Sequence, residues 1–339
     1  MKFFIRRIIR GNIAPVFFIR KMAVSLRKRI NRYVRIIMRK GEQTLEELFQ
    51  EKGLSKFWKP LKKHIKNGIY FSLKRVKEDA IAVGQSKVGG LPDLPEDVEW
   101  FTFQGRSMLF LSQINLEEVK SFDLEQKLPA SGILYFFYDP KHPWGFDPAD
   151  KGSSQVFFYQ GKPEHLKRRQ APPDLYEYTT DSDEFTAVFK SCRLRFRAAA
   201  DVPHWESDLV TKVEGIDIGC EEDWDNYYEM MEEMKREGEV RVNKLLGHSD
   251  NVQSGMEHRC ESVTNGIYCG EPTDDPKILA REKELEKNID TWTLLFQLDS
   301  NYDEADMMWD DGGRVYFWIK KEDLANENFE NGWTILQSH

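Results

Sequence analysis

Short apolar runs bounded by turn residues recur along the chain from residue 108 onward, which is typical of strands. Strands are predicted at Met108–Asn115, Gly132–Tyr138, Val156–Tyr159, Cys192–Phe196, Thr291–Asp299, Arg314–Ile319 and Trp333–Leu336, the last as an edge strand. Aromatic residues make up 13% of the chain and suit pleated, half-buried surfaces. The pattern therefore predicts a strand-rich core.

In the body of the chain, helical segments are predicted at residues 44–78, 223–237 and 276–288. The first opens with Thr44 as a predicted N-cap and Glu47 three residues later, the spacing of a capping box. Strands interrupted by a few flanking helices predict an α+β fold.

Three sequence blocks occur twice in the same order. Lys-x-x-Gly-x-x-Asp begins at Lys87 and again at Lys244, and each copy is followed by an apolar strand with one glutamine, Gln113 or Gln297. A Gly-x-x-Tyr-Phe strand then begins at Gly132 or Gly313. The repetition predicts two internally duplicated β-units, at about 85–200 and 240–339, within one domain spanning residues 41–339.

The polar residues on these strands are the candidate site. A glutamine in an apolar strand is unfavourable unless its amide is hydrogen-bonded, so Gln113 and Gln297 either satisfy backbone groups or face a ligand. The ligand-binding candidates, placed in a cleft between the repeats, are Gln113, Asn115, Gln297, Asp299, Trp309 and Asp311.

Metal and catalytic motifs are weak. The acidic stretch from Asp299 to Asp311 offers carboxylates for a hard cation or for acid–base chemistry, but its spacing is not that of an EF-hand loop, and a solvated loop explains it as well. His258, Cys260 and Cys269 lack a fourth zinc ligand at standard spacing. We therefore predict no metal and no cofactor, and a catalytic residue cannot be named.

Charge divides the chain unevenly. Residues 1–40 hold 13 Lys and Arg and no acidic residue, so the net charge of −8 leaves −21 on the rest. An acidic body disfavours nucleic acid and suits a basic protein partner. Residues 1–40 form a basic amphipathic arm. Three interpretations of this arm remain open: an interfacial helix on an anionic membrane, an organelle presequence, or a disordered extension that precedes a true start at Met22.

Four cysteines without redox or zinc spacing indicate reduced thiols and a cytoplasmic location, membrane-peripheral if the arm binds lipid.

The body resembles the YwqG-like family, a mostly bacterial family of unknown function. The resemblance covers roughly residues 45–339 and is carried by the stretch 85–95, Phe110–Leu116, 128–138, Trp144–Asp147, Lys244–Gln253, Met307–Gly313 and Tyr316–Ile319 with Asp323-Leu324. It implies an α+β fold with two related β-rich halves, cytosolic residence and no established activity, and residues 1–40 have no counterpart in it.

Three functional hypotheses follow from the sequence. The first is a non-enzymatic binding or interaction protein, of an immunity type, with its site between the β-units. The second is a hydrolase or transferase that acts on a small polar substrate through Asp299 or Asp311. The third is attachment to an anionic membrane surface through residues 1–40.

Overall fold

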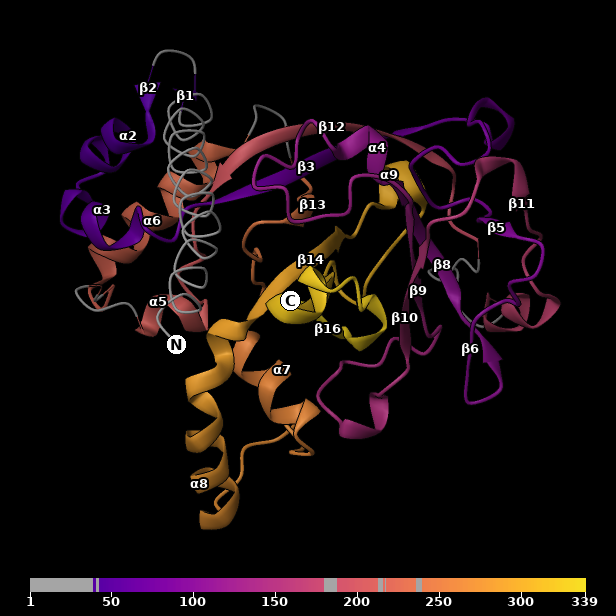
Figure 1. Cartoon of the computed structure of the whole chain (residues 1–339). Helices are drawn as coiled ribbons and strands as arrows, with labels where there is room; N and C mark the ends of the chain where they lie inside the picture. Colours follow the sequence, from indigo (N-terminus) through magenta and orange to yellow (C-terminus); the bar gives the residue numbers. More distant parts are fainter. Residues whose placement is uncertain (1–38, 41–42, 180–187, 213–215, 217, 236–239) are drawn as a thin grey trace, which may run out of the picture.

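One large antiparallel sheet organises the chain (Figure 1). The computed structural model describes all residues except 1–38, 41–42, 180–187, 213–215, 217 and 236–239. In sheet order the strands are β10 (Ser154–Tyr159), β9 (Ile133–Tyr138), β8 (Leu109–Asn115), β4 (Lys87–Val88), β12 (Cys192–Asp201), β3 (Lys66–Arg75), β13 (Asn243–Leu246), β14 (Trp292–Asp299), β15 (Arg314–Lys320) and β16 (Trp333–Gln337). A strand-rich α+β fold is thereby confirmed.

The strand order is balanced about a central pair, β12 and β3, which pair over ten residues. Four strands lie on each side of this pair. We name β4, β8, β9 and β10 the first β-unit, and β13, β14, β15 and β16 the second β-unit. Each unit runs in chain order away from the centre of the sheet.

The sheet curls until its two edges approach one another. Thr334 on β16 donates through Oγ1 to Ser154 Oγ on β10, at 2.7 Å. Inside the curl the rings of Phe136 and Phe296, one from each β-unit, stack with centroids 4.1 Å apart. The largest apolar cluster fills this interior, so the two units share one core.

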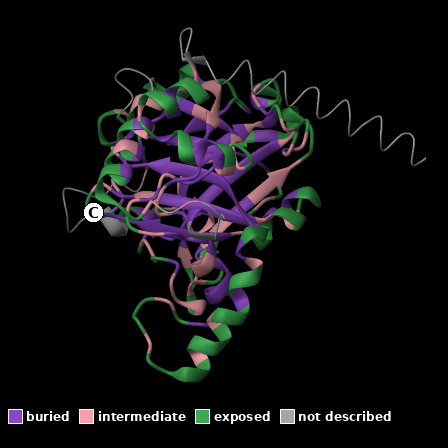
Figure 2. Cartoon of the chain, turned by 90° about the vertical axis from the view of Figure 1, so that its left-hand side faces the viewer, coloured by how far each residue is buried: buried purple, intermediate pink, exposed green. Residues whose placement is uncertain are grey.

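Helices cover the rim of the sheet. They are α2 (Leu45–Glu51), α3 (Ser55–Leu61), α4 (Leu116–Val119), α5 (Asp208–Lys212), α6 (Glu221–Met234), α7 (Glu257–Thr264), α8 (Pro276–Leu285), α9 (Tyr302–Ala305) and α10 (Lys321–Ala325). The 3₁₀ segments are η1 (Glu78–Ala80), η2 (Pro148–Asp150), η3 (Pro163–His165), η4 (Pro173–Thr179), η5 (Glu286–Thr291) and η6 (Phe329–Asn331). Within the described segments, three strand pairs lie outside the large sheet: β1 (Arg39–Lys40) with β2 (Gln43–Thr44), β5 (Asp93–Pro95) with β11 (Leu166–Arg168), and β6 (Thr102–Phe103) with β7 (Arg106–Ser107). Figure 2 shows the strands mostly buried and the helices largely exposed.

The prediction of a helix over residues 44–78 is wrong in its second half. Helices α2 and α3 form, and the capping box of Thr44 and Glu47 is present, but Lys66–Arg75 is strand β3. This segment pairs with β12 on one side and β13 on the other, and both pairings are remote in sequence. Non-local pairing of this kind overrides local helical pattern.

The other predicted elements form close to their expected bounds. Helices α6 and α8 correspond to the segments 223–237 and 276–288, although the end of the latter is the 3₁₀ segment η5. The strand predicted from Cys192 continues to Asp201, and the final strand lies at one edge of the sheet.

Candidate functional site

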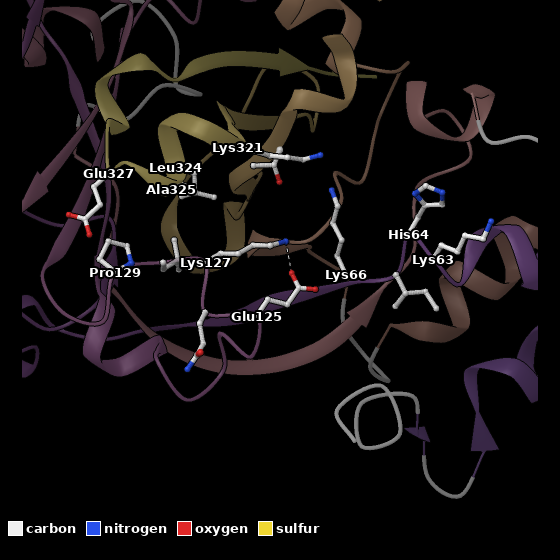
Figure 3. A pocket seen from close by; sticks show the side chains of 14 residues that line it. Lys63, His64, Lys66, Glu125, Lys127, Pro129, Lys321, Leu324, Ala325 and Glu327 are labelled. Carbon is white, nitrogen blue, oxygen red and sulfur yellow. Dashed lines mark ion pairs between the residues drawn. The ribbon is translucent and has the colours of Figure 1, made fainter. Parts of the chain in front are cut away.

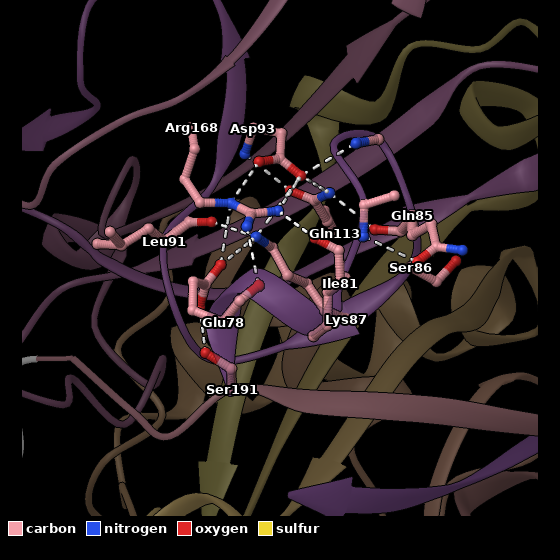
Figure 4. Close-up of polar contacts among 12 residues, drawn as sticks. Glu78, Ile81, Gln85, Ser86, Lys87, Leu91, Asp93, Gln113, Arg168 and Ser191 are labelled. Carbon is pink, nitrogen blue, oxygen red and sulfur yellow. Dashed lines mark hydrogen bonds and ion pairs between the residues drawn. The ribbon is translucent and has the colours of Figure 1, made fainter. Parts of the chain in front are cut away.

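The first β-unit surrounds Gln113 with protein hydrogen bonds (Figure 4). Its Nε2 donates to Gln85 O and to Asp93 Oδ2, each at 2.8 Å, and its Oε1 accepts from Asp93 N at 2.8 Å. The hydroxyl of Tyr135 donates to Asp93 O. The side chain of Gln113 is completely buried, so its amide holds the start of strand β5 at Asp93.

The second β-unit repeats these contacts around Gln297. Its Nε2 donates to Val242 O at 2.8 Å and to Asp250 Oδ2 at 3.1 Å, and its Oε1 accepts from Asp250 N at 2.9 Å. The hydroxyl of Tyr316 donates to Asp250 O at 2.6 Å. Residues at corresponding positions of the repeated sequence blocks therefore have corresponding partners.

Backbone geometry matches between the units as well. Lys87 pairs with Gln113, and Lys244 pairs with Gln297 in the same register. Gly89 and Gly90 have φ of 67° and 70°, and the equivalent Leu246 and Gly247 have φ of 58° and 78°. A leucine in this left-handed region is unusual, because its Cβ makes the conformation unfavourable.

A fully buried lysine lies in each network. The ammonium of Lys87 is 2.8 Å from a Glu78 oxygen and 3.5 Å from Asp93, and that of Lys244 is 2.8 Å from Asp201 and 2.6 Å from Asp250. Burial lowers the pKa of Lys87. Burial also acts against the charged form of Lys244, but Asp201 and Asp250 outweigh it and hold its pKa above the ordinary value. Both lysines neutralise buried carboxylates, which would otherwise be strongly unfavourable.

The six sequence candidates fall into separate places. Gln113 and Asn115 belong to the first network, where Asn115 also caps α4. Gln297 and Asp299 belong to the second, and Asp299 accepts hydrogen bonds from Val242 N and Arg314 Nε. Among the described contacts, no hydrogen bond joins the two networks.

The remaining two candidates lie elsewhere. Trp309 is completely buried in the shared core against Phe189 and Tyr138, and Asp311 is exposed. A ligand site made from all six residues stays a prediction.

A different set of residues lines a pocket of about 770 Å³ (Figure 3). One wall comes from residues 125–129 before β9, a second from Thr293 and α10, and a third from residues 63–66 at the start of β3. The pocket therefore receives residues from both β-units and from the central strand pair. Its lining residues are Lys63, His64, Ile65, Lys66, Glu125, Gln126, Lys127, Leu128, Pro129, Thr293, Lys321, Leu324, Ala325 and Glu327.

Hydrogen bonds fix the walls of this pocket. Asn67, next to Lys66 on β3, accepts from Leu124 N at 2.9 Å through Oδ1, and Asp123 Oδ2 accepts from Leu128 N at 2.7 Å. Leu324 anchors α10 in the shared core. The loop and the helix that carry the pocket side chains are thus attached to the sheet.

The electrostatics of the pocket are basic. Four of the lining residues are lysines and two are glutamates, a formal charge of +2 in a body that carries −21. Burial, and then the charges of Lys127 and Lys321, lower the pKa of Lys66 to about 8. Burial and the neighbouring lysines lower the pKa of His64 too. Such perturbed groups in a cavity are a common feature of functional sites.

Sequence reasoning missed this pocket. Residues 62–66 read Lys-Lys-His-Ile-Lys, a basic cluster in an acidic body, and that contrast was the available signal. The helix predicted over residues 44–78 does not place this cluster beside Lys127 and Lys321, because that position depends on strand β3.

Other chemistry is sparse in the part of the chain that the structure describes. There, no group of three or more His, Cys, Asp or Glu residues could hold a metal ion, and no helix is long and apolar enough to cross a membrane. The cysteines at 192, 220, 260 and 269 are free thiols.

The sequence was compared with curated proteins and with models of protein families. No curated protein matches the chain. The model of a domain of unknown function, DUF1963, matches residues 86–338, which include both β-units and most of the pocket. The chain therefore belongs to the DUF1963 family.

Proposed function

We propose that the chain is a ligand-binding protein and that its site is the pocket formed between the two β-units and the start of β3. One observation carries the proposal: residues from three remote segments line a single pocket of about 770 Å³. Pockets of 300–1,000 Å³ are of the size that holds small molecules in proteins. The sequence-based expectation of a site between the repeats is kept, with different residues.

Binding is better supported than hydrolysis. The carboxylate of Asp299 is engaged by Val242 and Arg314, so the acid–base role that the sequence suggested for it would require these contacts to break. The exposed Asp311 does not line the pocket. A basic protein partner and a cytoplasmic, membrane-peripheral location remain part of the proposal, supported by the acidic body and the basic arm.

We further infer that the two β-units arose by duplication of one unit, and that the chain is a YwqG-like protein. The matched lysine, glutamine, aspartate and tyrosine contacts support the duplication. A turn with two consecutive left-handed residues in each unit supports it as well. In a single core of two related units, the junction between them is a natural place for a site.

Native mass spectrometry tests the proposed function. The full chain is incubated with a small-molecule extract of its own source cells, beside Ala325→Trp, which puts an indole into the pocket from an exposed helical alanine. Ala280→Trp is the matched control, because Ala280 is an exposed helical alanine outside the pocket. We expect a bound mass on the unaltered chain and on the control but not on Ala325→Trp. Equal adducts on all three proteins, or none on the unaltered chain, would reject the proposal.

A further inference from the structure

We infer that the pocket binds a small organic anion carrying two or more negative charges on a phosphate or on carboxylates, and that Lys66, Lys127 and Lys321 hold it. The inference rests on the proposed function, since it names the chemical class of the ligand for the same site. Figure 3 shows these three side chains extending toward a common space from three different segments.

The three ammonium groups come together in a pocket that holds more lysines than carboxylates. Lys66 lies at the start of β3, Lys127 in the loop before β9, and Lys321 at the start of α10. The fold has thus gathered like charges from segments up to 255 positions apart in the chain. Like charges at one place are unfavourable in an unliganded protein, and a bound anion removes that cost.

Lys66 is the group with the most unused bonding capacity. An ammonium group has three N–H donors. Among the described residues, the one acceptor within hydrogen-bond distance of Lys66 Nζ is Gly247 O, at 3.3 Å. The other donors of this partly buried cation are therefore available to acceptors on a ligand.

The other two lysines also have donors that a ligand could use. Lys127 pairs with Glu125, and Lys321 donates to Asp290 O, so each has one partner for its three donors among the residues that the structure describes. The second acidic residue, Glu327, accepts from Gln160 Nε2 at 2.9 Å. Of the two pocket carboxylates, one is therefore paired with a lysine and the other is bonded to a neutral amide.

The apolar residues of the pocket indicate that the anion is organic. Ile65, Leu128, Pro129 and Leu324 line it beside the lysines. These side chains suit the carbon skeleton of a ligand whose charged end reaches the ammonium groups. A nucleic-acid strand fits poorly, because the charge of −21 on the surrounding body would repel its phosphates.

Comparison with Lys66→Arg isolates the proton uptake that belongs to Lys66. Its pKa of about 8 means that part of the free protein carries a neutral amine at pH 8. A bound anion stabilises the ammonium form and raises this pKa, so Lys66 takes up protons when the anion binds near pH 8. Lys66→Arg is charged at every accessible pH, so it should bind the anion without that uptake.

Isothermal titration calorimetry of the full chain at pH 8 tests the inference, in two buffers that differ in ionisation enthalpy. The probes are pyrophosphate and citrate, with glucose as the neutral control. We expect at least one anion to bind, and Lys66→Met and Lys321→Met to weaken it about tenfold each. Lys62→Met, an exposed lysine outside the pocket, should leave the affinity unchanged. Comparing pyrophosphate with citrate separates a phosphate ligand from a carboxylate ligand.

The outcomes separate the inference from the proposed function. If neither anion binds while the cell extract gives an adduct that Ala325→Trp abolishes, the ligand is of another class and only the inference fails. If no adduct forms either, both fail. Anion binding that Lys62→Met weakens as much as Lys66→Met indicates a diffuse surface effect and also overturns the inference.

Discussion

Replacing Lys66 with methionine should stabilise the folded chain at neutral pH, although it removes a residue that we place in the ligand site. In the folded protein, burial and the charges of Lys127 and Lys321 disfavour the Lys66 ammonium and lower its pKa from 10.5 to about 8. Methionine has similar length and no charge, so it removes this unfavourable electrostatic energy. Residues kept for function at a cost in stability are a common feature of binding sites.

The size of the effect follows from the fall in pKa. A change of one in pKa corresponds to about 1.4 kcal/mol, so the fall from 10.5 to about 8 corresponds to about 3 kcal/mol. The variant also loses the hydrogen bond to Gly247 O, which contributes about 1 kcal/mol. We therefore expect Lys66→Met to raise the free energy of unfolding by about 2 kcal/mol at pH 7.

The sign of the pH dependence is fixed by proton binding. Below pH 8, Lys66 is charged in the folded and the unfolded state, and the full cost is present. Between pH 8 and 10.5 the folded state loses the proton first, so the unfolded state binds more protons and the stability of the unaltered chain rises. The advantage of Lys66→Met should therefore shrink by roughly 2 kcal/mol between pH 7 and pH 10.

Urea unfolding of both proteins at several pH values measures this difference directly. Lys63→Met, an exposed lysine of the same pocket, controls for the loss of one positive charge and should change stability by less than about 0.5 kcal/mol. A Lys66→Met variant that is less stable than the unaltered chain at pH 7 would refute the reasoning. So would a difference between the two proteins that does not change with pH.

Three further predictions concern the rest of the molecule. Gln113→Leu and Gln297→Leu should each lower the free energy of unfolding by about 2–4 kcal/mol, since each removes the side-chain partner of one backbone N–H and one backbone carbonyl. Urea unfolding that shows no loss for either variant contradicts the assigned networks. Gly247→Ala should lower the free energy of unfolding by about 3 kcal/mol, because φ is 78° and the added Cβ would meet the Asp201 carboxylate. Gly105 also has a positive φ but lies in open space, so Gly105→Ala should lower it by about 1 kcal/mol in the same assay. Deletion of residues 1–40 should abolish binding to vesicles rich in anionic lipid, and retention of salt-sensitive binding in a flotation assay would contradict the role assigned to the arm.

Much of the sheet could be predicted because most strands on either side of the central pair are recognisable from their own apolar residues and flanking turns. Residues 109–115 and 292–299 are apolar runs bounded by polar residues, and they form β8 and β14 within one residue of the expected bounds. The repeated blocks predicted which strands resemble one another, and the contacts of Gln113 and Gln297 match position by position. The sequence left two roles open for these glutamines, and the structure shows their amides engaged by protein groups.

Strand β3 and the pocket could not be predicted from local sequence. Strand β3 depends on β12 and β13, which follow it by more than a hundred residues, so its conformation is decided by partners that no local window contains. The pocket has the same origin, because Lys66, Lys127 and Lys321 become neighbours only when the sheet curls. The basic cluster at residues 62–66 was visible, but a charge cluster alone does not say which residues it will face.

A crystal structure of the full chain with pyrophosphate or citrate, whichever titration shows to bind, tests the central claim most directly. We predict the anion in the pocket between the two β-units, with its oxygens at about 2.7–3.1 Å from the ammonium groups of Lys66, Lys127 and Lys321. An anion bound elsewhere on the chain, with only water in this pocket, would contradict it.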